Sequence, residues 1–414
     1  MDVKGLWHFL HRDASGRWAI WYLYLFAAIG LFSDFLANER PLVFREEGAW
    51  HFPIFRQMLA QVGLGQEEGK YVQEGWAGHS FEWVIRPLIP YSAETIDRRN
   101  LGAKSPFGPQ RVAHIRYWHW LGTDQSGHDV AAGLIHGARV ALFIGLIGML
   151  TATIVGVLLG AVAGYWGDSG LEMSIARMVA YGATALGASY FIWAHQYGRV
   201  EGEADGWHHV QTGLGLVLFF VLGKGIAWGM EKSAMLGRSV PLRVDFWVSR
   251  LTEVLNSLPT LLFILAILAT LEHPSIYYIM LVIGLLRWTG IARLVRAEML
   301  RVRTLQYVEA ARVLGLPDSR ILWRHALPNS LGPVWVALAF GMAGAVLVEA
   351  SLSFLGIGLT VETVTWGSLM RQLPGGNLRP WWLAVFPGLL IFLTVLAFNR
   401  LGESLSRAAR TGTE

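Results

Sequence analysis

The stretch YVEAARVLGLPDSRILWRHALPN, from Tyr307 to Asn329, interrupts a chain that is strongly apolar on both sides. Between Leu305 and Leu314, apolar residues recur at the period of an amphipathic helix. Gly315 follows, where a helix C-terminus favours a residue that tolerates positive φ. A Pro-Asp pair then begins a second short apolar face, which Pro328 ends. The sequence therefore predicts two short amphipathic helices joined at a glycine, with an exposed face that needs a partner.

Composition places the rest of the chain in a membrane. The 414 residues are 53% hydrophobic and 15% charged, which is too apolar for an ordinary soluble domain and indicates an all-α polytopic membrane protein. The absence of cysteine excludes disulfides, thiolate metal sites and cysteine nucleophiles. Eight apolar stretches approach the length of about 20 residues that a crossing helix needs. They are residues 18–37, 139–163, 178–194, 212–228, 255–271, 276–291, 334–348 and 381–398.

Arginines indicate where the loops lie, because basic residues gather in short cytoplasmic loops. Residues 293–329, called the basic loop below, contain Arg293, Arg296, Arg301, Arg303, Arg312, Arg320 and Arg324. We therefore expect the basic loop to be cytoplasmic, and an even number of crossings puts both termini on that side. The turn with Glu201, Glu203 and Asp205 is then extracytoplasmic. The first crossing lacks a small-x-small cleavage site, which favours a retained anchor over the alternative of a cleaved signal peptide.

These patterns divide the chain into regions. A cytoplasmic N-terminus (1–17) precedes the first membrane helix (18–37), an extracytoplasmic segment (38–137) and a second core helix (138–168). Residues 169–244 form an insert with two expected membrane helices, and a hairpin on the cytoplasmic surface is the alternative. Residues 245–400 hold the remaining core helices and the basic loop, before a cytoplasmic tail (401–414).

Six residues of the basic loop form a distinctive pattern: Glu309, Ala310, Ala311, Gly315, Leu327 and Pro328. This pattern closely resembles the EAA signature of permease subunits of binding-protein-dependent ABC importers, in which it forms a coupling helix that docks on an ATPase. The signature has an aliphatic residue where His325 stands, and the peptide-permease branch is similar to "RHALPN". The resemblance implies that these six residues couple the chain to an ATPase.

Further stretches extend the resemblance across most of the chain. LGTDQSGHDVAAGLIHGARVALFIG, EASLSFLGIGL and WWLAVFPGLLIFLTVLAFNRLGE are similar to segments of the C-subunit type of dipeptide and oligopeptide permeases. His128 stands where that family usually has Arg, and Ala141 where it often has Ser. The family passes almost directly from its second to its third span, so residues 169–244 are an addition to its six-helix core.

The resemblance also implies the partners and the work of the chain. A second permease subunit, two cytosolic ATPases that bind the ATP, an extracytoplasmic solute-binding protein and membrane lipid are expected, with no nucleic acid and no cofactor in this chain. Import proceeds by alternating access, in the inner membrane, as ATPase movement passes through the basic loop. Peptides are the implied substrate, although nickel, peptide-antibiotic and some sugar importers share the subfamily.

Other functions find less support in the sequence. GDSG at residues 167–170 resembles the nucleophile turn of serine proteases, but no pattern places a histidine against Ser169. No HExxH or comparable spacing predicts a metal site, and "LGKGI" lacks the spacing and hydroxyl of an ATP-binding loop. A helix-turn-helix DNA reader would need access that the flanking spans deny. The alternatives that stay open are a channel or scaffold and an intramembrane protease.

Glu349 is the best-placed charge inside a predicted span. It lies near the extracytoplasmic end of the stretch that begins at Val334. Removing an ionised group from water costs several kcal/mol, so such a residue is a functional candidate. We expect Glu349 either to contact a translocating substrate or to pair with a neighbouring subunit.

Overall fold

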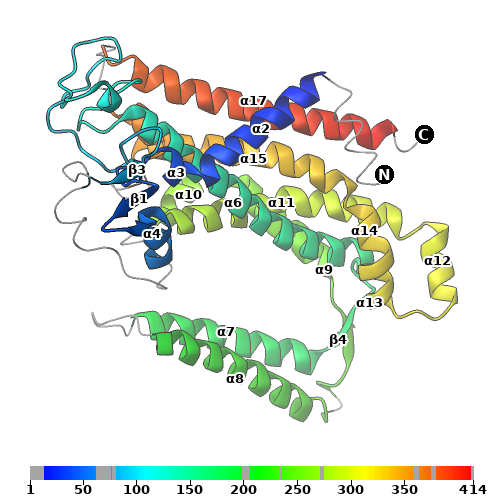
Figure 1. Ribbon diagram of the computed structural model, residues 1–414. Helices are drawn as coiled ribbons and strands as arrows, with labels where there is room; N and C mark the ends of the chain where they lie inside the picture. Colours follow the sequence, from blue (N-terminus) through cyan, green and yellow to red (C-terminus); the bar gives the residue numbers. More distant parts are fainter. Residues whose placement is uncertain are drawn as a thin grey trace.

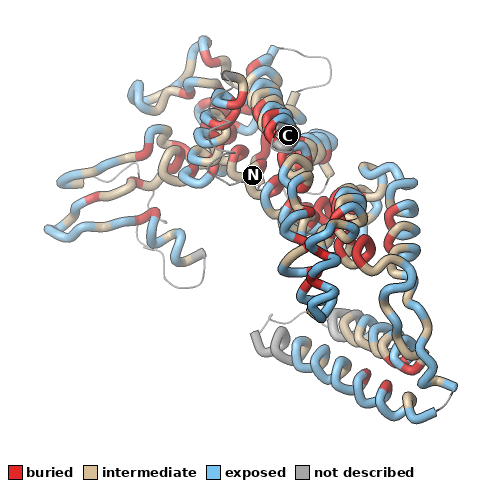
Figure 2. Tube along the Cα trace, turned by 90° about the vertical axis from the view of Figure 1, so that its right-hand side faces the viewer, coloured by how far each residue is buried: buried red, intermediate tan, exposed pale blue. Residues whose placement is uncertain are grey.

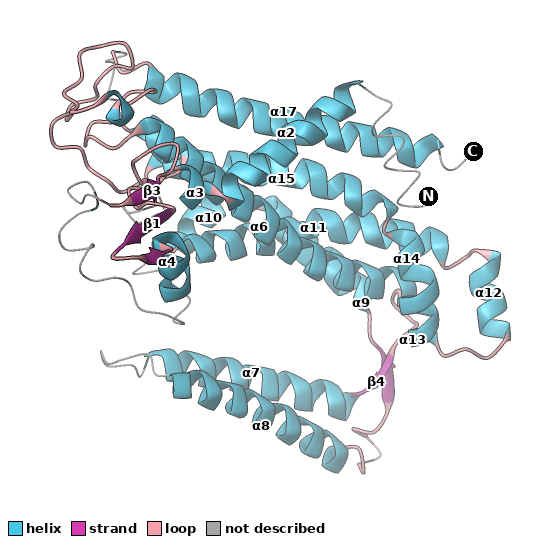
Figure 3. Cartoon of the chain, in the orientation of Figure 1, coloured by secondary structure: helices cyan, strands magenta, loops and turns pink. Residues whose placement is uncertain are grey.

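The computed structural model describes residues 14–61, 76, 81–197, 206–233, 235–270, 275–357, 363–373 and 379–411. Long helices run side by side as a bundle, with a small sheet at one end and the basic loop at the other (Figures 1 and 3). The bundle consists of α2 (Ala14–Leu31), α6 (Val130–Trp166), α9 (Val244–Ser257), α10 (Thr260–Ala269), α11 (Ile276–Val302), α15 (Gly332–Leu355) and α17 (Trp382–Thr411). The described parts of both termini lie at the end of the basic loop (Figure 1).

The pair α6 and α11 forms the centre of the bundle. Gly156, Gly160 and Gly164 recur every four residues on α6 and face α11. A Cβ at Gly160 would lie 2.5 Å from the carbonyl oxygen of Ala292, so the two backbones are in direct contact there. With 37 residues at about 1.5 Å each, α6 is longer than the roughly 30 Å hydrocarbon layer. It therefore joins the two ends of the molecule.

In the described residues, fewer helices than expected are long and apolar enough to cross a membrane. Within the described residues, five helices are long and apolar enough to cross alone: α6, α11, α15, α17 and Thr212–Met230 of α8. The pair α9 and α10 makes a sixth if it counts as one span. The helices α2 and α7 coincide with two of the eight predicted stretches but are not among these.

The crossing predicted at residues 255–271 is not one straight helix. The chain bends by 86° between α9 and α10. Pro259 has no N–H to donate and favours extended backbone in the residue before it. Leu258 is accordingly extended, with φ −88° and ψ 134°. The bend therefore follows from the proline.

Residues 38–137 carry the sheet. Strands β1 (Val43–Glu46), β2 (Ala49–His51) and β3 (Trp83–Ile85) pair antiparallel in the order β2-β1-β3, with Phe44 opposite both His51 and Val84. Phe44 is fully buried and stacks on the His51 ring at 4.7 Å. Helices α3 (Ser33–Leu36) and α4 (Pro53–Gln61) and the 3₁₀ turn η2 (Ile115–Tyr117) complete this end, while α16 (Trp366–Arg371) packs on α15 and α17.

The insert stands apart from the bundle (Figures 1 and 2). Its helices α7 (Ile175–Tyr197) and α8 (Gly206–Met230) are held to the bundle by a ribbon of β4 (Glu172–Ser174) and β5 (Ser239–Pro241), which pair antiparallel. Glycines let the helices approach, since a Cβ at Gly215 would lie 2.4 Å from the Phe191 ring. Most of α8 is exposed in this chain alone (Figure 2). Glu201, Glu203 and Asp205, assigned to an outside turn, lie outside the described residues.

Candidate functional site

The first helix of the basic loop, α12 (Gln306–Val313), ends at a left-handed glycine. Gly315 has φ +74°, and its N–H donates to the Arg312 carbonyl at 2.9 Å. The Leu316 N–H donates to the Ala311 carbonyl at 3.2 Å. Together these bonds form a Schellman motif, which satisfies carbonyls at the helix end. The expected positive φ at Gly315 is confirmed.

One side of α12 packs on the bundle and the other faces outward. Val308 is fully buried and Ala311 is 7% exposed, whereas Glu309 and Ala310 are exposed. Leu314 has the same helical spacing as Val308 and Ala311 but does not pack with them, because the helix ends at Val313 and the cap turns Leu314 outward. Val313 is 88% and Leu314 79% exposed, so α12 presents an apolar tip at the end of the molecule (Figure 1).

The second half of the basic loop is a continuous set of turns: α13 (Asp318–Arg320), the π-helical turn η3 (Ile321–Ala326) and α14 (Leu327–Ser330). Ile321, Leu322 and Ala326 are fully buried against residues of α6 and α11. The expectation that Pro328 ends this half is wrong. Pro328 lies in the first turn of α14, where its missing N–H is tolerated. Leu327 is buried and Pro328 exposed. This half therefore anchors the basic loop.

Side chains at the end of α6 hold the two halves together. The Tyr165 hydroxyl donates to Asp318 Oδ1 at 2.8 Å, and the Arg312 guanidinium lies 5.8 Å from the centre of the Tyr165 ring. Arg303 Nη1 donates to the Gly164 and Tyr165 carbonyls at 3.3 and 3.2 Å. The last turn of α6 therefore positions α12, because the Tyr165 side chain and the Gly164 and Tyr165 carbonyls all contact residues of the basic loop.

Glu349 lies inside the chain. Its side chain is 1% exposed and accepts a hydrogen bond from the Ser353 hydroxyl at 2.7 Å, and the Thr365 side chain also bonds to it. The carboxyl group therefore ties α15 to the start of α16 in this conformation. The structure does not bring Glu349 to a surface where a substrate or another subunit would reach it.

Arg287, which the sequence reasoning missed, is a charged residue inside a membrane helix. It lies in α11, eleven residues after Ile276 and fifteen before Val302. Its guanidinium rests on α15 at Gly344, where a Cβ would lie 2.5 Å from Arg287 Nη2. In the described part of the chain it has no hydrogen-bond or ion-pair partner. The signal was available, because Arg287 interrupts the apolar stretch 276–291.

A buried histidine joins the segment of residues 38–137 to α6. His119 is fully buried, with Nδ1 2.8 Å from Asp129 Oδ2 and Nε2 3.2 Å from Asp97 Oδ2. Asp129 is also the N-cap of α6 and accepts from the Ala132 N–H at 2.7 Å. Burial lowers the pKa of His119, but the hydrogen bonds to Asp129 and Asp97 and their charges outweigh burial, so the pKa is raised. The protonated imidazole therefore links two carboxylates.

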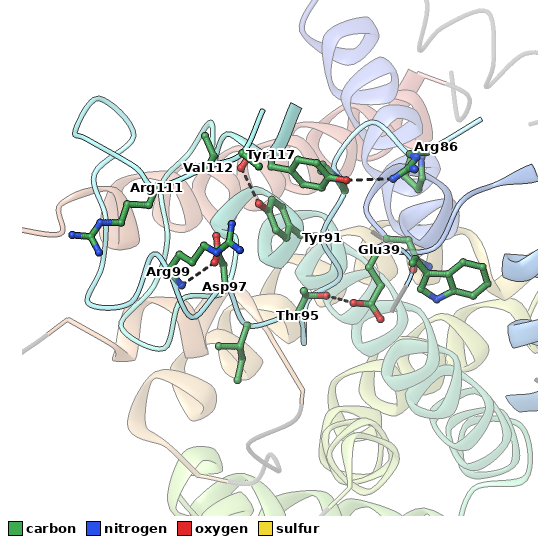
Figure 4. Close-up of a pocket in the computed structure, with 15 residues that line it drawn as sticks. Glu39, Arg86, Tyr91, Thr95, Asp97, Arg99, Arg111, Val112 and Tyr117 are labelled. Atoms are coloured by element: carbon green, nitrogen blue, oxygen red, sulfur yellow. Dashed lines mark hydrogen bonds between the residues drawn. The ribbon is translucent and has the colours of Figure 1, made fainter. Parts of the chain in front are cut away.

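A cavity of about 390 Å³ lies beside this cluster (Figure 4). Arg86 Nη1 donates to the Tyr117 hydroxyl at 3.3 Å, and the Thr95 hydroxyl donates to Glu39 at 3.0 Å. Asp97 forms part of the wall (Figure 4). The cavity therefore holds charges of both signs, most of them already hydrogen-bonded within the segment.

The other residues discussed from the sequence, His128, Ala141 and the turn at residues 167–170, make contacts within the fold. His128 pairs with Asp124 at 2.8 Å, and Ala141 is 1% exposed within the bundle. Asp168, in the turn that resembled a protease motif, accepts from the Phe246 N–H at 2.8 Å. Ser169 is exposed, and no hydrogen bond joins it to a histidine among the described residues. This turn therefore fixes the start of α9.

The chain is similar in sequence to proteins of a known transport family. Residues 232–411 match the family model described as "Binding-protein-dependent transport system inner membrane component". The inner membrane ABC transporter permease protein YejE of Escherichia coli K12 is 26% identical over 97% of this chain and 95% of its own length. The dipeptide transport system permease protein DppC of Bacillus subtilis 168 is 28% identical, over 70% of this chain and 68% of its own.

A third relative is a protein of Brucella suis biovar 1, named as a peptide transport system permease. It is 35% identical over 51% of this chain and 71% of its own length. The matched family model covers the bent pair α9 and α10, the basic loop and the last helices. The chain belongs to the family of inner membrane components of binding-protein-dependent transport systems, and it is a permease of the ABC importer type.

Proposed function

We propose that this chain is one of two permease subunits of a peptide importer and that α12 docks on a cytosolic ATPase subunit. The relatives named as dipeptide and peptide permeases support the substrate class. ATP is bound and hydrolysed by two partner ATPases, and an extracytoplasmic binding protein delivers the peptide. The basic loop and both termini face the cytosol.

The exposed tip of α12 is the observation that carries this proposal. Val313 and Leu314 expose apolar side chains beside the charged Glu309, on a helix whose other side is packed. An apolar centre with a charged rim is typical of protein–protein interfaces. Four residues of the predicted signature, Glu309, Ala310, Ala311 and Gly315, lie in α12 or its C-terminal cap, and Leu327 and Pro328 lie in α14. Because α12 is packed on the bundle on one side and exposed on the other, a partner bound to the exposed side can transmit a rigid-body movement to the bundle.

The movement would pass into α6. Tyr165 and Arg303 connect the basic loop to the end of α6, and the close contact with α11 keeps these two helices together. Displacement of α12 by ATPase closure would therefore move α6 and α11 as one unit. Because α6 reaches the extracytoplasmic cluster at Asp129, both ends of the pathway would respond.

Site-specific cross-linking tests the docking. A photoreactive phenylalanine analogue at Val313 should cross-link to the ATPase subunit in membranes that contain the whole complex. The same analogue at Leu88, which is 80% exposed at the opposite end, should not. Equal cross-linking from both positions, or none from Val313 in an assembled complex, would contradict the proposal.

A further inference from the structure

We infer that Arg287 is an intramembrane binding site for a carboxylate of the transported substrate, the terminal carboxylate of a peptide. This inference rests on the proposed function for the substrate class. Its structural basis is a guanidinium near the middle of α11 that has no anionic partner in the described part of the chain. A cation inside a membrane helix normally pairs with a carboxylate or marks a substrate path.

The surroundings of Arg287 keep space beside its charge. Gly344 supports the guanidinium from α15, and any side chain there would displace it. One turn along α11, a Cβ at Gly290 would meet no other segment within 4 Å. Leu294, a further turn on, is 41% exposed. Residues three and four apart share one side of a helix, so Arg287, Gly290 and Leu294 define an open side of α11.

That open side is not covered by α6. The contacts of α11 with α6 use other positions, including Trp288, Ile291 and Val295 at the glycines of α6. Arg287 therefore lies at the boundary between the packed centre of the chain and a free face of α11. A carboxylate that moves along this face can reach the guanidinium, which offers paired N–H donors in the plane that a carboxylate prefers.

Polar groups continue from Arg287 toward the basic loop. Arg293, which is exposed and has no partner among the described residues, lines a cavity of about 530 Å³ between α9 and α11. The same cavity is lined by Ser249, Thr252 and Asn256, and by Glu253, whose carboxylate is paired with Arg250 at 2.8 Å. The Thr289 hydroxyl donates to Asn256 Oδ1 at 3.1 Å. A second cation and a set of hydroxyl and amide groups favour a route for a polar substrate over a single ion pair with another subunit.

Peptides with and without a carboxylate test the inference. The whole complex with its binding protein is reconstituted in liposomes, as wild type, Arg287→Gln and Arg287→Lys. Uptake of radiolabelled trialanine is compared with uptake of its C-terminal amide. For each peptide, uptake by the variant is divided by uptake by wild type. This ratio does not depend on the affinity of that peptide for the binding protein. Arg400→Gln, which removes an exposed arginine paired with Glu403 at 3.1 Å, is the control.

We expect Arg287→Gln to lower uptake of free trialanine at least tenfold and to leave uptake of the amide within twofold. Arg287→Lys should be intermediate, because it keeps the charge without the planar pair of donors. An equal loss for both peptides, or loss of the second permease on co-purification, would overturn the inference and indicate an ion pair between subunits. Unchanged uptake of both would also overturn it.

The proposed function has a separate readout. Stimulation of ATP hydrolysis by loaded binding protein in the wild-type complex reports the importer activity. If hydrolysis is stimulated and wild type imports both peptides, only the role of Arg287 is in question. If wild type imports neither peptide, the peptide assignment fails and the substrate named for Arg287 fails with it.

Discussion

The hydroxyl of Tyr165 donates a hydrogen bond of 2.8 Å to Asp318, across 153 residues of sequence. Tyr165 lies in the last turn of the longest helix of the bundle, and Asp318 begins the second half of the basic loop. One hydrogen bond thus fixes the direction in which the loop leaves the bundle. It acts together with the packing of Val308 and Ala311 and with the Arg312–Asp318 ion pair at 3.8 Å to hold α12 and its exposed tip.

Tyr165→Phe should loosen the basic loop. Loss of a hydrogen bond to a carboxylate that is about half exposed should cost about 1 kcal/mol, which corresponds to roughly a fivefold change in a local opening equilibrium. Hydrogen–deuterium exchange of the backbone amides of residues 306–330 in the purified protein measures this directly. Tyr278→Phe is the control, since the Tyr278 hydroxyl has no partner among the described residues. Equal exchange in Tyr165→Phe and wild type would refute the role of the bond.

Gly315→Val should impair transport without preventing membrane insertion. The substitution places a β-branched residue at φ +74°, at a cost on the order of 1–2 kcal/mol. No atom lies within 4 Å of the position a Cβ would take, so backbone strain is the only cause. Gly315→Asn should keep most activity, because Asn tolerates the left-handed region. Peptide uptake at equal permease abundance checks both, and wild-type uptake by the Val variant would count against the coupling assignment.

Gly160→Val should destabilise the central helix pair. A Cβ there would lie 2.5 Å from a backbone carbonyl of α11, which moves only if the helices separate. Overpacking of this kind costs about 1–3 kcal/mol. The melting temperature in detergent, followed by tryptophan fluorescence, should fall clearly. Gly225→Val on α8 is the matched control, because its Cβ meets no other segment, and a similar fall in both variants would disprove the contact as the cause.

The His119 cluster should make the extracytoplasmic segment more stable in mild acid. The pKa of His119 is raised above its ordinary value of 6.5, so its stabilising protonation is complete below about pH 6.5 and is lost as pH rises through the raised pKa. His128 contributes with the same sign, since the hydrogen bond to Asp124 raises its pKa. The pKa of Asp97 is lowered, so its own contribution is lost only in stronger acid.

Hydrogen–deuterium exchange around residues 97–129 at pH 6 and pH 8, corrected for the intrinsic rate, tests this expectation. Wild type should be less protected at pH 8, and the difference should shrink in His119→Gln and vanish in the variant that also carries His128→Gln. Greater protection at the higher pH would show that the histidines are neutral when folded.

Cysteine labelling tests the topology of the insert. The chain has no cysteine, so single substitutions report without background. Gly206→Cys and Leu88→Cys should react with an impermeant thiol reagent added outside, whereas Met235→Cys should not. Met235 is 81% exposed, so a cysteine at this position is open to the reagent wherever the reagent has access to that side. The opposite labelling would reject two crossings in the insert.

Local sequence signals predicted local structure well. The positive φ at Gly315 follows from a single residue type at a helix end. The bend between α9 and α10 follows from Pro259, a local signal that lies within an apolar run. Positions that depend on distant packing were not predictable. Leu314 has the right spacing for the packed face but lies beyond the last turn of α12. Glu349 is buried by contact with Thr365, which is sixteen residues further along the chain. The position of the Arg287 guanidinium depends on its contact with Gly344 of another helix.

The β4–β5 ribbon should allow the insert to be removed without disturbing the bundle. Ser174 and Ser239 are paired across the two strands, so the chain leaves the bundle and returns to it at neighbouring points about 5 Å apart. A two-residue Asn-Gly turn could join these strands directly, as in an ordinary β-hairpin. A shortened permease made this way would keep the register of every later helix. The same joint is a natural place for evolution to add or exchange a helical pair, and for an engineer to graft a reporter domain beside an undisturbed transporter.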